Sequence, residues 1–101
     1  MDKYKVLLFY KYAPVEDPAG MVKEHQKFCD SNNLKGRVFI AAEGINGTVS
    51  GLEPDTEKYK SYLKSFPQFS DIIFKEDESD KHAFLKMHVR LKKEIVHSDL
   101  N

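Results

Sequence analysis

Hydrophobic and polar positions along the chain predict short strands separated by two helices. The run from Tyr4 to Lys11 is rich in β-branched, aromatic and leucine residues and is too short to favour a helix, so it predicts a strand. Both of its alternating faces are apolar: Leu7 and Phe9 on one face, and Val6, Leu8 and Tyr10 on the other. We therefore expect a central strand that is at least partly buried on both faces.

Two segments show the three- and four-residue apolar spacing of helices. The first is expected to start at Asp17-Pro18, because aspartate caps helices and proline is tolerated at the first helical position, and to end near 31–33. The second is expected to start at Pro54 and to end at Pro67. The apolar positions are Met21, Val22, Phe28 and Cys29, with His25 between them, in the first helix, and Tyr59, Tyr62, Leu63 and Phe66 in the second.

Further strands are predicted at residues 37–42, 48–50, 71–75 and 84–92, with an acidic loop at 76–80. Glu43, Gly44, Asn46 and Gly47 predict a tight hairpin turn, because Asn-Gly favours positive φ, which we expect at Gly47. Glu43 and Asn46 could also present a carboxylate and an amide at the end of the sheet. In the last strand, the alternation predicts that one face fills the core with Leu85, Met87, Val89 and Leu91.

The element order is strand, helix, strand, strand, helix, strand, with one extra short strand before the last. This order predicts an α+β fold, the ferredoxin-like or acylphosphatase-like split βαβ sandwich, with an antiparallel sheet and two helices on one face. A length of 101 residues suits one domain. We expect the domain to occupy residues 1–96 and a linker to begin at 97–101, because the alternation is lost in the tail.

Composition narrows the possible functions. Sixteen lysine and arginine residues balance sixteen acidic residues, so nucleic-acid binding has to be argued from local charge. The single cysteine excludes an internal disulfide framework and a multi-cysteine zinc site, and the four histidines lack metal-ligand spacing, so we expect no metal and no cofactor. The apolar runs are too short to cross a bilayer, and we expect a cytoplasmic protein without a membrane partner.

The last strand carries a basic stripe on its polar face, formed by Lys86, His88, Arg90 and Lys92. On the open side of a helix-backed sheet, such a stripe could bind RNA phosphates and bases, with Phe9 or Tyr10, and Phe39, as stacking surfaces. The alternation alone leaves open which of these aromatic side chains face outward. It could equally be a solvated face that keeps the sheet soluble.

The sequence gives little support for catalysis within this chain, and no catalytic residue is predicted. Acylphosphatase chemistry is disfavoured because the loop at residues 12–15 lacks the arginine and glycine pattern that cradles a phosphate. Cys29 is expected to be a buried, unreactive core thiol, because it shares the apolar stripe of the first helix.

Four strings occur in a fixed order between residues 7 and 96: LLFYKY (7–12), EHQKFC (24–29), LKGRVFIAAEGINGTVSG (34–51) and HAFLKMHVRLKKEIV (82–96). Together they closely resemble the N-terminal, acylphosphatase-like domain of the rhodanese-like tRNA uridine hydroxylases, the TrhO or YceA family. The matching motif residues are Glu43, Gly44, Ile45, Asn46, Gly47 and Thr48, and His82, Lys86, His88, Arg90 and Lys92.

The resemblance implies a domain of a cytoplasmic, mostly bacterial enzyme that uses oxygen to hydroxylate C5 of the wobble uridine in certain tRNAs. In this family a rhodanese domain with the reactive cysteine follows, and its cysteine loop is absent from this sequence. We therefore expect this fragment alone to be non-catalytic. The implied partners are tRNA, at its anticodon region, and the protein's own C-terminal rhodanese domain.

Three roles remain open for the domain. It could bind tRNA and dock on the rhodanese domain. It could pack on that domain and shape its pocket without touching RNA. It could also contribute Glu43 or Asn46 to the active site across the interface.

Overall fold

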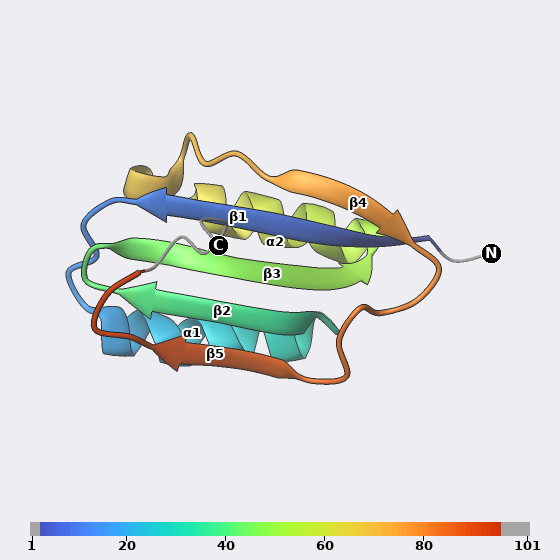
Figure 1. Cartoon of the computed structure of the whole chain (residues 1–101), viewed down its shortest axis with the longest axis horizontal. Helices are drawn as coiled ribbons and strands as arrows, with labels where there is room; N and C mark the ends of the chain where they lie inside the picture. The colour runs from blue at the N-terminus through green and yellow to red at the C-terminus, as the bar shows by residue number, and fades with distance from the viewer. Residues whose placement is uncertain (1–2, 96–101) are drawn as a thin grey trace, which may run out of the picture.

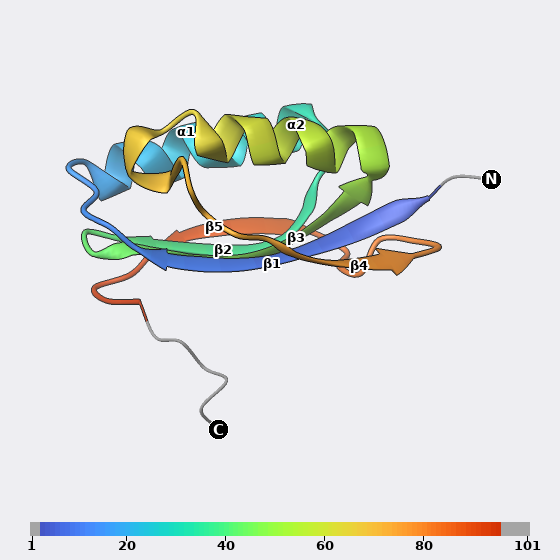
Figure 2. The same cartoon turned by 90° about the horizontal axis from the view of Figure 1, so that it is seen from above.

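The computed structural model describes residues 3–95, and the expected linker at 97–101 lies outside them. Within this range the chain forms one sheet, with strand order β4-β1-β3-β2-β5, and two α-helices that lie together on one face of it (Figures 1 and 2). The elements are β1 (Tyr4–Tyr12), α1 (Pro18–Ser31), β2 (Lys35–Ala41), β3 (Gly44–Leu52), α2 (Glu53–Lys64), η1 (Pro67–Phe69), β4 (Lys75–Ser79) and β5 (Met87–Leu91).

The sheet confirms the predicted α+β fold and adds one parallel pair to it. β1 pairs antiparallel with β3 and β4, and β2 pairs antiparallel with β3. β5 pairs parallel with β2, so the sheet is mixed rather than antiparallel throughout. The reason is the connection from β4 to β5, which crosses the end of the sheet and enters the opposite edge in the direction of β2 (Figure 1).

Both helices form where the sequence predicts them. The Asp17 side chain accepts a hydrogen bond from the Gly20 amide at 3.1 Å and caps α1. The two helices cover the core-facing side chains of the sheet, among them Leu7 and Phe9. Cys29 is fully buried in this core, as expected.

β1 is buried on its helix-facing side only. Leu7 and Phe9 lie in the core, whereas Leu8, Tyr10 and Tyr12 on the other face are 38%, 44% and 53% exposed. The expectation of burial on both faces is met by the half-buried Val6 but is wrong for Leu8 and Tyr10, because both helices within residues 3–95 lie on the opposite side (Figure 2). We refer to this uncovered side of the sheet as the open face.

The hairpin turn lies earlier in the chain than expected. β2 ends at Ala41 and β3 begins at Gly44, so Ala42 and Glu43 form the turn and Asn46 and Gly47 lie inside β3. Positive φ occurs at Gly44 (+156°), not at Gly47, so that prediction is wrong.

Gly44 is required by the close approach of β1. A Cβ at this position would lie 2.2 Å from the Lys11 carbonyl oxygen. Glycine therefore satisfies both the backbone conformation and the packing here.

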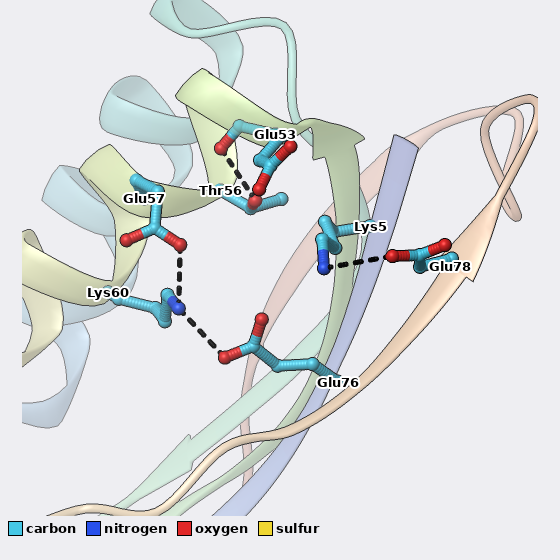
Figure 3. A network of polar contacts seen from close by, with 7 residues as sticks. All are labelled: Lys5, Glu53, Thr56, Glu57, Lys60, Glu76 and Glu78. Atoms are coloured by element: carbon cyan, nitrogen blue, oxygen red, sulfur yellow. Dashed lines mark hydrogen bonds and ion pairs between the residues drawn. The ribbon is translucent and has the colours of Figure 1, made fainter. Parts of the chain in front are cut away.

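The acidic segment expected to be a loop is the edge strand β4, and of the expected strand at 71–75 only Lys75 belongs to it. Figure 3 shows how lysines compensate its charge. Lys60 Nζ lies 2.8 Å from a Glu76 carboxylate oxygen, and Lys5 Nζ lies 3.5 Å from one of Glu78. Strand alternation places both glutamates on one side, where α2 and β1 supply these lysines.

β5 is shorter than the strand predicted at 84–92. Met87 and Val89 are buried as expected, but Leu85 is 94% exposed and Leu91 is 54% exposed, so the core prediction is wrong for these two. Leu85 precedes the strand, where the two-residue period does not apply, and Leu91 ends an edge strand that pairs on one side only.

Candidate functional site

A hollow of about 470 Å³ opens on the open face, over the parallel pair β2 and β5. It is lined by Arg37, Phe39, His88, Arg90 and Lys92. The register places Arg37 beside His88 and Phe39 beside Arg90, so strand alternation turns these four side chains to the same face. We call this feature the basic hollow.

The side chains of the basic hollow contact one another. Lys92 Nζ lies 4.9 Å from the centre of the Phe39 ring, which is the geometry of a cation–π contact. An Nη atom of Arg90 donates to His88 Nδ1 at 3.3 Å. The hollow thus combines two arginines, one lysine and one aromatic face, a set that suits a phosphate group next to an unstacked base.

The structure brings together three of the four residues of the predicted basic stripe. His88, Arg90 and Lys92 line the hollow, whereas Lys86 is exposed before β5 and is not among the lining residues. The backbone carbonyl of Lys86 accepts a hydrogen bond from the Gly36 amide at 2.9 Å.

The sequence prediction of the stripe missed Arg37. A signal was present, because Arg37 and Phe39 share one face of β2. It could be used only with the knowledge that β2 and β5 are neighbours.

The predicted turn residue Glu43 lies at the end of the sheet toward which β2 and β5 both run (Figure 1). Its backbone carbonyl accepts a hydrogen bond from the Ala13 amide at 2.9 Å. Its side-chain Oε2 accepts one from the Ile95 amide at 2.8 Å. The carboxylate therefore holds the chain's own backbone after β5.

The loop at residues 12–15, which corresponds to the phosphate-binding loop of an acylphosphatase, is hydrogen-bonded to the β2–β3 turn. The amides of Ala13 and Val15 donate to the carbonyls of Glu43 and Ala42, each at 2.9 Å. Pro14 has no amide hydrogen. The amide hydrogens of Ala13 and Val15 are therefore already bonded to backbone carbonyls and do not form a phosphate-binding site.

His82, from the second matching motif, anchors the connection between β4 and β5. Its Nδ1 lies 3.2 Å from Ser50 Oγ, and its ring meets the Tyr4 ring edge-on at 4.7 Å. Burial, together with the charge of Lys35, lowers the pKa of His82. These contacts give His82 a structural role in this domain.

Cys29 has the properties of a core thiol. It is fully buried, and this burial, reinforced by the nearby charge of Asp30, raises its pKa to about 12. The thiol is therefore protonated at neutral pH and is a poor nucleophile.

Residues 3–95 contain neither a metal-binding cluster of side chains nor a membrane-spanning helix. No three or more His, Cys, Asp or Glu side chains in this range gather where they could hold a metal ion. None of the helices in the described part of the chain is long and apolar enough to cross a membrane.

Solved structures with the same fold include BLUF proteins. The structure titled BlrP1 BLUF superposes with a TM-score of 0.74 at 16% identity and covers 92% of this chain and 66% of that one. The BLUF protein BlrB gives a TM-score of 0.72 at 12% identity, covering 92% of this chain and 74% of that one. At these identities the likeness establishes the fold alone.

Other proteins are more similar to this chain in sequence than the BLUF proteins are. The proteins named tRNA uridine(34) hydroxylase from Staphylococcus haemolyticus and Shouchella clausii are both 54% identical to this chain, over 93 and 98 residues. The matches cover 92% and 97% of this chain but only 29% and 30% of those proteins, so the chain spans about a third of their length. Residues 4–95 also match the family described as the UPF0176 acylphosphatase-like domain. The chain therefore belongs to the UPF0176 acylphosphatase-like domain family.

Proposed function

We propose that this chain is the N-terminal domain of an oxygen-dependent tRNA wobble-uridine C5 hydroxylase of the cytoplasm, and that it binds the anticodon region of tRNA through the basic hollow. Relatives at about 50% identity that carry the name tRNA uridine(34) hydroxylase support the enzyme class. The chemistry itself is assigned to the remainder of the protein, the expected rhodanese domain.

The observation that carries RNA binding is the composition of the basic hollow. The guanidinium groups of Arg37 and Arg90 can each bind a phosphate with two donors. Phe39 offers a ring on which an unpaired base can stack. Anticodon loops present unstacked bases next to phosphates, which is the pattern that this arrangement fits.

Lys92 would change partner when RNA binds. Its ammonium group lies 4.9 Å from the centre of the Phe39 ring, over the surface on which a base would stack. The exchange of this cation–π contact for a phosphate contact costs little, because an exposed cation–π contact stabilises by only about 0.5–1 kcal/mol.

A structural role is the second candidate. The net charge of zero and the contact of Glu43 with the segment after β5 favour a domain that packs on the remainder of the enzyme without touching RNA. The two roles differ in whether the basic hollow contributes to tRNA affinity.

The deciding experiment measures tRNA affinity in the full-length enzyme with Arg37→Glu and Arg90→Glu combined. We expect affinity to fall roughly 100-fold or more, because the two lost charged hydrogen bonds cost about 1.5–3 kcal/mol each. The matched control is Lys23→Glu with Lys27→Glu, the same charge change on exposed positions of α1 on the other side of the molecule. Equal affinities of the two folded double mutants would leave the structural role as the function of the domain.

A further inference from the structure

The backbone of Ile95 is held from both sides. Its amide donates to Glu43 Oε2 at 2.8 Å, and its carbonyl oxygen accepts a hydrogen bond from the Tyr12 hydroxyl at 3.0 Å. Glu43 belongs to the β2–β3 turn and Tyr12 to the end of β1, so two separate parts of the sheet converge on this residue. We call these two hydrogen bonds the exit clasp.

The exit clasp fixes a hydrophobic residue on the open face. Ile95 is only 4% exposed, although it lies beyond the last strand. Figure 2 shows that residues 92–95, the coloured stretch after β5, turn away from the helices toward the other side of the sheet. The last described residues after β5 therefore lie on the face that carries the basic hollow.

The open face also carries an unusual row of large side chains. Leu8, Tyr10 and Tyr12 alternate along β1, and each is more than a third exposed. One face of an antiparallel sheet is commonly solvated and polar, so a row of large apolar and aromatic side chains on that face, next to the held Ile95 backbone, marks an interaction surface.

From these observations we infer that the exit clasp directs the part of the enzyme that follows residue 95 onto the open face, where it docks over β1 beside the basic hollow. The occupant is the remainder of the same polypeptide, since relatives extend to about three times the length matched here. This inference rests on the proposed function only in treating the chain as a domain of the longer enzyme.

The docking would place RNA binding and chemistry on adjacent surfaces. Glu43 and Tyr12 act here as positioning residues, because they hold the backbone of the connection rather than tRNA. A connection pinned at its first residue restricts where the following domain can lie, which raises its effective concentration at the open face. Glu43 then contributes to hydroxylation without touching the uridine.

The first test is hydrogen exchange of the full-length enzyme, read at the Ile95 amide. We expect Glu43→Ala to speed exchange at Ile95 at least tenfold, and Glu43→Gln to retain most of the protection, because its amide oxygen can still accept the bond. The amide of Val49, in the middle of β3, serves as the control for global stability. Unchanged exchange at Ile95 in Glu43→Ala would show that the exit clasp does not exist.

The second test addresses docking with Leu8→Glu, and its matched control is Ile73→Glu, an 84% exposed position outside the strands. We expect Leu8→Glu and Glu43→Ala to increase proteolysis of the connection after residue 95 and to lower the hydroxylation rate severalfold, at unchanged tRNA affinity. Ile73→Glu should change none of these. The docking would be overturned if Leu8→Glu and Glu43→Ala both matched the unmodified enzyme in proteolysis and in hydroxylation rate. The basic hollow is tested separately, by the tRNA affinity of the double variant Arg37→Glu with Arg90→Glu.

Discussion

His25 Nε2 and the Tyr59 hydroxyl lie 2.8 Å apart and form a hydrogen bond between α1 and α2. Both residues are completely buried, and within residues 3–95 the other ring nitrogen of His25 has no hydrogen-bond partner. Burial lowers the pKa of His25 to about 4, because a charged imidazolium would lose its hydration there. The histidine is therefore neutral in the folded domain at physiological pH.

This pair predicts acid sensitivity of folding. The unfolded chain binds a proton at His25 near pH 6.5, whereas the folded domain binds it only near pH 4. The contribution of neutral His25 to the free energy of unfolding is therefore fully present above pH 6.5 and is lost as the pH falls from 6.5 to 4. At pH 4.5 the loss should be roughly 2–3 kcal/mol relative to pH 7. Urea unfolding at the two pH values measures it.

His25→Gln provides the control, because glutamine can hydrogen-bond Tyr59 without titrating. We expect His25→Gln to be less stable than the unmodified domain at pH 7. Its free energy of unfolding should, however, fall less between pH 7 and pH 4.5, by most of the roughly 2–3 kcal/mol that His25 contributes to this loss. Carboxylates whose pKa is lowered by lysines, such as Glu76 beside Lys60, affect both proteins equally and cancel in the comparison. Identical pH profiles of the two proteins would mean that folding does not lower the pKa of His25.

Cys29 should resist modification in the folded domain. With the side chain fully buried and its pKa raised to about 12, a thiol reagent at pH 8 should label it only after unfolding by urea. Cys29→Ser should lower the free energy of unfolding by about 1–3 kcal/mol, since it places a hydroxyl among apolar neighbours. Rapid labelling under native conditions would contradict this picture.

The two glycines of the matching motif should differ in their tolerance of a methyl group. Gly44→Ala combines a φ of +156° with a Cβ 2.2 Å from a backbone oxygen of β1, and should cost about 2–4 kcal/mol. Gly47→Ala meets its nearest backbone atom at 2.9 Å with no unusual φ, and should cost about 1–2 kcal/mol. Thermal or urea unfolding of the two variants gives the order, and a larger loss for Gly47→Ala would reverse it.

Local signals in the sequence predicted the helices and the fold class. Asp17-Pro18 marks the start of α1, and the proposed capping bond is present. The faces of β1 were ambiguous, because aromatic and aliphatic residues occupy both of them and only the placement of the helices decides which is buried. β4 was missed because acidic residues disfavour strands in isolation, and the lysines that pair with them come from α2 and β1.

The sequence predicts which residues of the candidate site share a face of one strand, but not which strands lie next to one another. His88, Arg90 and Lys92 follow from the alternation of one segment, but Arg37 joins them through a parallel pairing between residues some fifty positions apart. The same limit applies to Glu43, which the motif singled out and whose partner at Ile95 depends on the path of the chain after β5. Nonlocal topology, rather than residue propensity, determines both arrangements.

The basic hollow makes a last prediction that separates charge from stacking. If Arg37, Arg90 and Lys92 each neutralise one phosphate, tRNA-anticodon binding by the full-length enzyme should include a contribution of roughly −2 to the slope of log affinity against log salt. Arg90→Gln should reduce the steepness by about 0.7. Phe39→Leu should weaken binding by about 1–3 kcal/mol, that is roughly five- to 150-fold, while the slope stays unchanged. Filter binding or fluorescence titration of an anticodon stem-loop at several salt concentrations provides both quantities. If Phe39→Leu altered the slope and not the affinity, or Arg90→Gln altered neither, the basic hollow would not be the RNA site.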